Sequence, residues 1–325
     1  MRNSLRIVIM IGVFVLAMFN VSLAADYPTK PITLINPNPP GGGHDAIGRS
    51  FASIAEKHLG QPVVVVNKSG ASGLIGMVSL VQAAPDGYTL GLDSTTTTNA
   101  LEWEVANGRK TPFTRNDLIP IGCLTINVPL VVVPYKSPWK TLPDMVKDCK
   151  EKPDTYAFCS GGLYGGSHLP AEVLAMSTGI KVRHVPYKGG GPCLTALVGE
   201  HVHFATQWPA STIPLVRGNK LKVLAVQDDR RLSSLPDVPT VKELGIDAVW
   251  NQWLGISAPK KTPAPIIEKL KGVIKHVTED PSFIKIIEDQ GGEVRYLSSD
   301  EVVKLCDAET NRLAIIYKRL IETKK

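Results

Sequence analysis

The sequence lacks the motifs of the common enzyme classes. It has no GxxxxGK(S/T) phosphate loop and no GxSxG nucleophile elbow, and the glycines between Gly70 and Gly76 do not have the spacing of the dinucleotide fingerprint. It also has no CxxC pair and no His/Cys cluster at zinc-ligand spacing. We therefore expect a protein that is not an enzyme, with no cofactor and no metal site.

The sequence has only a small excess of charge of one sign. The chain has 36 Lys and Arg against 30 Asp and Glu, a formal net charge of +6. It contains no dense Lys/Arg stripe with interleaved aromatic residues, which argues against nucleic acid as a partner. A mild positive excess favours anionic small molecules over cationic ones. Cysteine is sparse and odd in number, so at least one thiol is free or pairs outside the chain. The five cysteines stand at positions 123, 149, 159, 193 and 306.

Long apolar runs are missing after the first residues of the chain. Arg2 and Arg6 precede an unbroken apolar run over residues 7–19, and small residues follow at Ser22 and Ala24. This is the pattern of a secretory signal peptide, with the run too short for a comfortable membrane span. We predict that residues 1–24 are removed by cleavage near Ala24 and that the mature chain is exported.

The most informative stretch that is present runs from Pro39 to Asp45. It follows an apolar run, Ile32–Ile35, that predicts a buried strand, and it precedes a helical pattern that continues to Gly60. The apolar positions of that pattern are Ile47, Phe51, Ile54, Ala55 and Leu59. We expect Asp45 to be the N-cap. Free helical N–H groups beside a glycine turn favour an anion, although an ordinary capped strand-to-helix connection fits this stretch equally.

The same arrangement recurs along the chain. Turns rich in glycine follow predicted strands near residues 41, 70, 162 and 190, and each precedes a helical segment, with Ser167 a candidate cap for the third. Alternating strands and helices predict an α/β architecture with mostly parallel sheets, in which ligands sit beyond the carboxyl ends of the strands. Two turns lie early in the chain and two in the middle, so we expect two lobes that share an anion-binding cleft.

Several residues have both a chemical and an ordinary interpretation. Cys159 and His168 could pair as nucleophile and base, but a cysteine that ends an apolar strand in an exported protein is more often structural. His44 lies next to Asp45, yet two adjacent loop residues do not make a metal site. Trp250 is expected in core or hinge packing.

Short segments spread over the predicted mature chain match one family in order. They are Pro40–Gly42 with Asp45, 60–65 with Asn67 and Gly70–Gly73, 84–90, Ser167–Leu169, His184–Gly189, Leu224–Val226 with Arg230, 235–240, and Ala258–Pro259 with Thr262–Pro263. On these motifs the chain resembles the Bug-type periplasmic substrate-binding proteins of tripartite tricarboxylate transporters.

The resemblance implies a two-lobed class II periplasmic-binding-protein fold with the ligand cleft between the lobes. Residues 25–127 plus 251–325 are expected to form the first lobe and residues 128–250 the second. It further implies a periplasmic, monomeric receptor that closes on a small carboxylate and delivers it to membrane permease subunits. The ligand-binding residues that it implies are Pro40, Gly41, Gly42, Asp45, Gly70, Ala71, Ser72, Ser160, Gly161, Ser167, His168, Gly189, Gly190, Gly191, Gln207 and Trp208. A sensor partner of a signalling system, or an enzyme that reuses the fold, remains an alternative.

The departures from the family pattern concern the ligand. Asn38 stands where the family often has an aromatic residue, and Gln207-Trp208 stands where many members have Asp-Asn. Loss of the acid removes a partner for an ammonium group, and Trp208 offers a ring for stacking. We therefore expect a mono- or dicarboxylate without an amine, with aromatic acids included. The family also implies a Cys159–Cys193 disulfide, although Cys193 stands about three positions later than in relatives.

Overall fold

The computed structural model describes residues 27–41, 43–163, 166–289 and 292–322 of the 325-residue chain. The predicted signal peptide and its cleavage site near Ala24 lie outside the described residues, as does Gly42. Within the described ranges, every helix is too short or too polar to cross a membrane.

The first sheet contains the N-terminal strands. Its strand order is β11-β4-β10-β3-β1-β2. The strands are β1 (Ile32–Asn36), β2 (Val63–Asn67), β3 (Thr89–Ser94), β4 (Leu118–Asn127), β10 (Gln252–Pro259) and β11 (Glu293–Ser298). β1 is parallel to β2 and β3, whereas β10 is antiparallel to β3 and β4, and β11 is antiparallel to β4.

The second sheet is built from the middle of the chain, in the order β7-β6-β8-β5-β9. Its strands are β5 (Leu130–Pro134), β6 (Ala157–Ser160), β7 (Arg183–Pro186), β8 (Phe204–Gln207) and β9 (Leu221–Val226). β6 is parallel to β7 and β8, and β5 is antiparallel to β8 and β9. The expectation of mostly parallel sheets is therefore wrong, because both sheets are mixed. The antiparallel strands include those that carry the chain from one sheet to the other and back.

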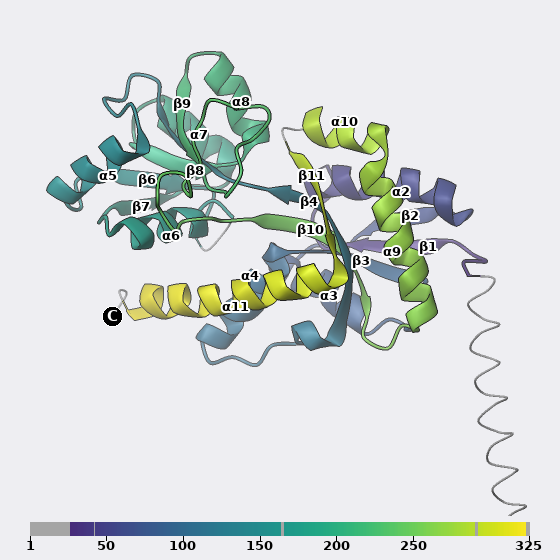
Figure 1. The fold of residues 1–325 in the computed structure, drawn as a ribbon. Coiled ribbons are helices and arrows are strands. Elements are labelled where there is room, and N and C mark those ends of the chain that lie inside the picture. The colour runs from purple at the N-terminus through teal and green to yellow at the C-terminus, as the bar shows by residue number, and fades with distance from the viewer. Residues whose placement is uncertain (1–26, 42, 164–165, 290–291, 323–325) are drawn as a thin grey trace, which may run out of the picture.

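Helices cover both sheets (Figure 1). They are α2 (Gly43–Leu59), α3 (Leu74–Val81), α4 (Thr95–Ala106), α5 (Leu142–Glu151), α6 (Leu169–Thr178), α7 (Gly190–Val198), α8 (Pro209–Arg217), α9 (Ala264–Glu279), α10 (Pro281–Asp289) and α11 (Ser299–Glu322), with short 3-10 turns at Ala71–Gly73 and Arg115–Asp117. All five apolar positions predicted for α2 are in the core of the first sheet, where α9 packs beside them. The helical spacing thus identified the buried face correctly.

The chain passes between the sheets twice, and the two passages touch. It leaves the first sheet between β4 and β5 and returns between β9 and β10. Gln227 joins the passages, because its N–H donates to the Pro129 carbonyl and its carbonyl accepts from Trp250 N–H, both at 2.9 Å. Two segments that are distant in sequence are therefore held side by side where the chain crosses between the sheets.

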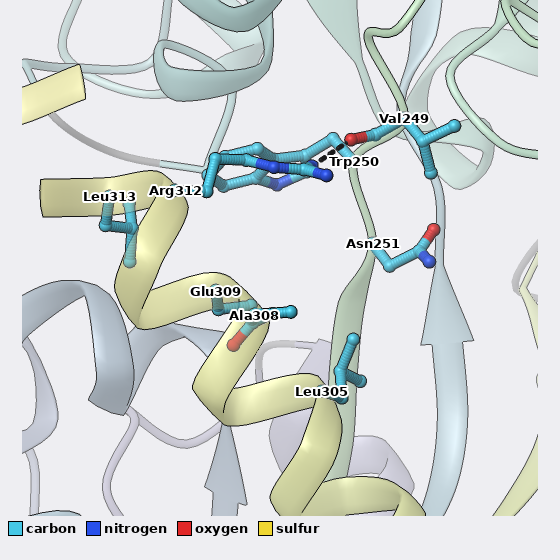
Figure 2. A pocket seen from close by; sticks show the side chains of 8 residues that line it. All are labelled: Val249, Trp250, Asn251, Leu305, Ala308, Glu309, Arg312 and Leu313. Atoms are coloured by element: carbon cyan, nitrogen blue, oxygen red, sulfur yellow. Dashed lines mark hydrogen bonds between the residues drawn. The ribbon is translucent and has the colours of Figure 1, made fainter. Parts of the chain in front are cut away.

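The C-terminal helix α11 belongs to both halves of the molecule. Its first part contacts β4 and β11, and it runs along α4. Its last turns carry Leu313, Ile316 and Tyr317 into the core under the second sheet. Arg312, on the same helix, donates to the Val249 carbonyl beside a small pocket against the returning passage (Figure 2).

Candidate functional site

A cleft of about 970 Å³ lies between the two halves. The loop before α2 and the start of α2 form the wall that belongs to the first half, and the start of α8 forms the wall that belongs to the second. The last residue of β4, the first residue of β10 and Ile287 of α10 also line the cleft. The lining residues are Asn38, Pro39, Pro40, Gly41, His44, Ala46, Ile47, Asn127, Trp208, Pro209, Ala210, Ser211, Gln252, Ile287 and Gly292. No Asp, Glu, Lys or Arg is among these described lining residues, so the polar side chains of the described lining are uncharged ones and His44.

Asp45 organises the first wall but does not cap the helix as expected. Helix α2 begins two residues earlier, and the carboxylate turns back over the glycine loop. It is 3% exposed and is held by four donors. These are Gly41 N–H (2.9 Å), Asn67 Nδ2 (2.8 Å), Asn36 Nδ2 (3.2 Å) and Arg49 Nε (2.9 Å). The Arg49 guanidinium, with the other donors, holds the pKa of Asp45 well below its usual range. Asp45 therefore shapes the loop through bonds within the protein, and its carboxylate does not line the cleft.

The second glycine turn packs against the end of the first strand. A Cβ added at Gly76 would lie 2.9 Å from Pro37 Cα and 2.7 Å from the Lys68 carbonyl, and Gly73 has a positive φ of 93°. Only glycine allows the start of α3 to lie so close to the residues that follow β1 and β2. The predicted residues Gly70 and Ala71 are exposed beside this contact and do not line the cleft. The side chain of Ser72 lies outside the described residues.

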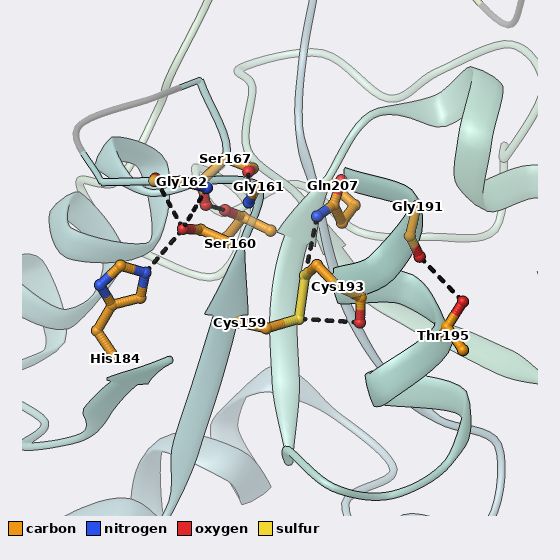
Figure 3. Close-up of a disulfide and its surroundings, with 11 residues drawn as sticks. Cys159, Ser160, Gly161, Gly162, Ser167, His184, Gly191, Cys193, Thr195 and Gln207 are labelled. Carbon is orange, nitrogen blue, oxygen red and sulfur yellow. Dashed lines mark hydrogen bonds between the residues drawn. A yellow bond between two sulfur atoms is a disulfide. The ribbon is translucent and has the colours of Figure 1, made fainter. Parts of the chain in front are cut away.

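Part of the predicted site in the second half, around Gly161, Ser167 and Gln207, forms one connected cluster (Figure 3). Gly161 N–H donates to Ser167 Oγ at 2.9 Å, and Gly189 N–H donates to the Gly161 carbonyl at 3.0 Å. A Cβ on Gly161 would lie 3.0 Å from Gly190 N, and one on Gly190 would lie 3.3 Å from Gln207 Oε1. Gly191 follows in the first turn of α7. Ser167 thus accepts from the neighbouring turn and does not cap α6, whose N-cap is His168 without a side-chain cap bond.

A disulfide holds this cluster together. Cys159 at the end of β6 is bonded to Cys193 in α7, with Cα atoms 5.6 Å apart (Figure 3). Gln207 is buried and donates through Nε2 to Cys193 Sγ at 3.1 Å, so its side chain faces the disulfide and does not line the cleft. Because Cys159 is bonded, the alternative of a Cys159 nucleophile with His168 as its base does not apply.

Two further predicted residues point into the protein. His168 is buried, stacks on His184 at 3.9 Å between ring centroids and contacts Glu172 Oε1 at 3.2 Å. Ser160 is fully buried, with Oγ 2.7 Å from His184 Nε2. Burial, with His168 as a smaller cause, lowers the pKa of His184 to about 3. Neither Ser160 nor His168 is among the residues that line the cleft.

The predicted residues that do reach the cleft are Pro40, Gly41 and Trp208. Trp208 lies directly before α8, and a Cβ on Gly166 would lie 3.0 Å from its ring. The loop that follows β6 therefore supports the Trp208 ring, and Gly166 leaves room for it.

Sequence reasoning missed several polar residues of the cleft. His44, which was set aside as a metal ligand, lines the wall with its Nδ1 2.8 Å from Asn38 Nδ2. Burial lowers the pKa of His44 to about 4, so the ring is neutral at pH 7. Asn127 is the last residue of β4 and Gln252 the first residue of β10, where the chain leaves and re-enters the first sheet. Asn38 stands where the family often has an aromatic residue, and this difference was the sequence signal that a polar side chain could contact His44.

The chain matches the tripartite tricarboxylate transporter family receptor over residues 47–322. Protein BugT of Bordetella pertussis is 32% identical over 96% of this chain and 96% of its own. A TctC solute-binding protein from Polaromonas, solved without ligand, superposes with a TM-score of 0.82 at 30% identity, over 90% of this chain and 99% of that one. MatC from Rhodopseudomonas palustris, with bound malate, superposes with a TM-score of 0.70 at 26% identity, over 90% of this chain and 100% of that one.

These matches confirm the two-lobed periplasmic-binding architecture and the resemblance that the short motifs indicated. They extend over nearly all of the described chain and over nearly the full length of the relatives. The chain belongs to the receptor family of the tripartite tricarboxylate transporters.

Proposed function

We propose that this chain binds a small carboxylate in the cleft and delivers it to the membrane permease subunits of a tripartite transporter, after export to the periplasm. The observation that carries the proposal is the chemistry of the cleft. The N-terminal ends of α2 and α8 lie on opposite walls, and the described lining contains no carboxylate. Free N–H groups and the positive ends of two helix dipoles favour an anion.

The absence of charged groups from the described lining suits a transport receptor. Hydrogen bonds from uncharged donors are weaker than those of ion pairs, so they hold an anion while allowing its release. An amino acid is a poorer ligand, because the described lining contains no acid that could receive an ammonium group, and the nearby Asp45 carboxylate already accepts from four donors. We therefore assign a mono- or dicarboxylate without an amine.

The binding motion that we propose is a hinge closure of two lobes. Lobe 1 comprises residues 25–127 and 251–325 and contains the strands of the first sheet; lobe 2 comprises residues 128–250 and contains those of the second. The two passages that meet at Gln227 are the hinge. Closure brings Trp208 towards the loop that carries Pro40 and Gly41.

Isothermal titration calorimetry of the mature chain tests this function. The protein is first unfolded and refolded to remove bound ligand, then titrated with succinate, malate, adipate, benzoate and glutamate. We expect at least one amine-free acid to bind. Binding of glutamate alone would overturn the ligand class, and binding of none of the five would overturn the receptor proposal.

One substitution refines the ligand class. If Trp208 stacks on an aromatic acid, Trp208→Ala weakens benzoate binding more than succinate binding, by about two- to tenfold. Tyr135→Ala is the matched control, because Tyr135 is an exposed aromatic residue outside the cleft. Equal losses for both acids would show that Trp208 does not select aromatic ligands.

A further inference from the structure

We propose that His44 is a specificity-determining residue of the cleft, held by Asn38 so that its Nε2–H donates to an anionic oxygen of the ligand. The inference rests on the proposed carboxylate-binding function. It adds the residue on the lobe 1 wall that binds the anionic group of the ligand. His44 lines the cleft, and its Nδ1 lies 2.8 Å from Asn38 Nδ2.

A chain of hydrogen bonds fixes the orientation of the two amides that precede His44. The Asp45 carboxylate is ionised and can only accept, so the group of Asn36 that lies 3.2 Å away must be its NH2. Asn36 Oδ1 therefore faces Asn38. It accepts from Asn38 N–H at 3.1 Å and from Asn38 Nδ2 at 3.4 Å.

The orientation of Asn38 then decides the tautomer of His44. Since Asn38 Nδ2 is a donor, the imidazole nitrogen that it contacts must accept, and the single proton of a neutral ring must be on Nε2. The ring is neutral at pH 7 because burial lowers the pKa of His44 to about 4. Asp45, Asn36 and Asn38 thus act in series to present an N–H group at His44.

The Nε2–H group has no protein acceptor among the described residues, where Asn38 is the one hydrogen-bond partner found for His44. His44 is one of the residues that line the cleft, so we infer that a ligand accepts from this group. A neutral N–H donor accepts nothing, so it favours a carboxylate oxygen and disfavours an ammonium or amide N–H at the same place. The structure therefore assigns to the His44 side chain the selection of a ligand group that only accepts hydrogen bonds, such as a carboxylate.

The affinity test uses the full mature chain with succinate, malate, adipate and benzoate as probes. We expect His44→Ala to weaken binding of the preferred acid by about ten- to a hundredfold, the usual effect of losing one hydrogen bond to a charged group. His201→Ala, at an exposed histidine outside the cleft, is the matched control and should bind as the wild type does. Unchanged affinity in His44→Ala would overturn the inference, whereas failure of the wild type to bind any of the acids overturns the receptor function itself.

A double-mutant cycle tests whether Asn38 acts through His44. Asn38→Ala should weaken binding in the wild-type background and have no further effect in the His44→Ala background. Additive losses would show that Asn38 does not act by positioning His44. Independent of any ligand, ¹⁵N NMR of histidine-labelled protein should show His44 as the Nε2–H tautomer at pH 7, and the Nδ1–H tautomer would overturn the proposal.

Discussion

Arg295 and Asp228 form an ion pair across the two halves of the protein, with 2.8 Å between Arg295 Nη2 and Asp228 Oδ2. Arg295 is on β11 of the first sheet, and Asp228 follows β9 of the second. The Asp228 side chain is completely buried and the Arg295 side chain is 13% exposed. Burial raises the pKa of Asp228, and the guanidinium opposes that shift. The pair therefore joins a strand of the first sheet to the segment that follows a strand of the second.

Removing one partner of this pair should be costly. Arg295→Met leaves a buried carboxylate without its cation, and we expect the free energy of unfolding to fall by about 3–5 kcal/mol. Urea denaturation at pH 7 measures the change. The double variant Arg295→Met/Asp228→Asn should recover part of the loss, because it leaves no buried carboxylate without its cation; Glu293, the other partner of Arg295, is 39% exposed.

Lys285→Gln provides the control for that measurement. Lys285 pairs with Asp289, but the two side chains are 75% and 65% exposed. Exposed pairs contribute little, so the change should stay below about 1 kcal/mol. A cost for Arg295→Met no larger than this would contradict the role given to the buried pair.

Acid should destabilise the protein through His184. Its folded pKa of about 3 lies below the unfolded value of about 6.5. The unfolded state therefore binds more protons between these values, so the stability is complete above about pH 6.5 and is lost as the pH falls. One such histidine gives a slope of up to about 1.4 kcal/mol per pH unit.

His184→Phe should make this slope shallower while keeping a ring in the stack with Phe158. Urea denaturation at several pH values between 4 and 7 measures the effect, with His201→Ala as the control that retains the wild-type slope. A slope that does not change in His184→Phe would place the source of acid sensitivity elsewhere.

The Cys159–Cys193 disulfide predicts the number of reactive thiols and a contribution to the free energy of unfolding. Unfolded protein without reductant should expose three thiols to a colorimetric reagent, those of Cys123, Cys149 and Cys306, and five after reduction. Cys159 and Cys193 are 34 positions apart, so opening the bond should lower the free energy of unfolding by about 2–4 kcal/mol. Five reactive thiols before reduction would contradict the bond.

Local patterns predicted the local structure well. Turn chemistry and helical spacing identified the strand, glycine turn and helix that carry Gly41 and the buried face of α2, because these depend on neighbours in the chain. Strand direction was predicted less well. β10 and β4 are antiparallel because the chain leaves the first sheet at the end of β4 and returns to it at the start of β10. The apolar pattern of a strand does not show in which direction the chain crosses the sheet.

The roles of the site residues were also hard to predict, because they depend on contacts with residues that are distant in the sequence. Asp45 and Ser167 have the residue types of helix caps, but each accepts from a backbone N–H of a glycine loop, Gly41 and Gly161 respectively. Gln207 was expected to contact the ligand, and its amide instead faces Cys193 Sγ. The role of His44 depends on amide orientations in two other residues, which no spacing rule can supply.

The path of α11 has a consequence for the order in which the protein folds. Residues 130–226 contain all the strands of the second sheet, yet Leu313, Ile316 and Tyr317 complete the core beneath it. A ribosome makes the chain from its N-terminus, so these three side chains emerge long after the strands that they pack under. The strands of the second sheet can pair early, but one side of their core stays unfilled until residue 317 has been synthesised. A chain that stops a few turns short would leave an apolar surface uncovered on the part of the protein made long before.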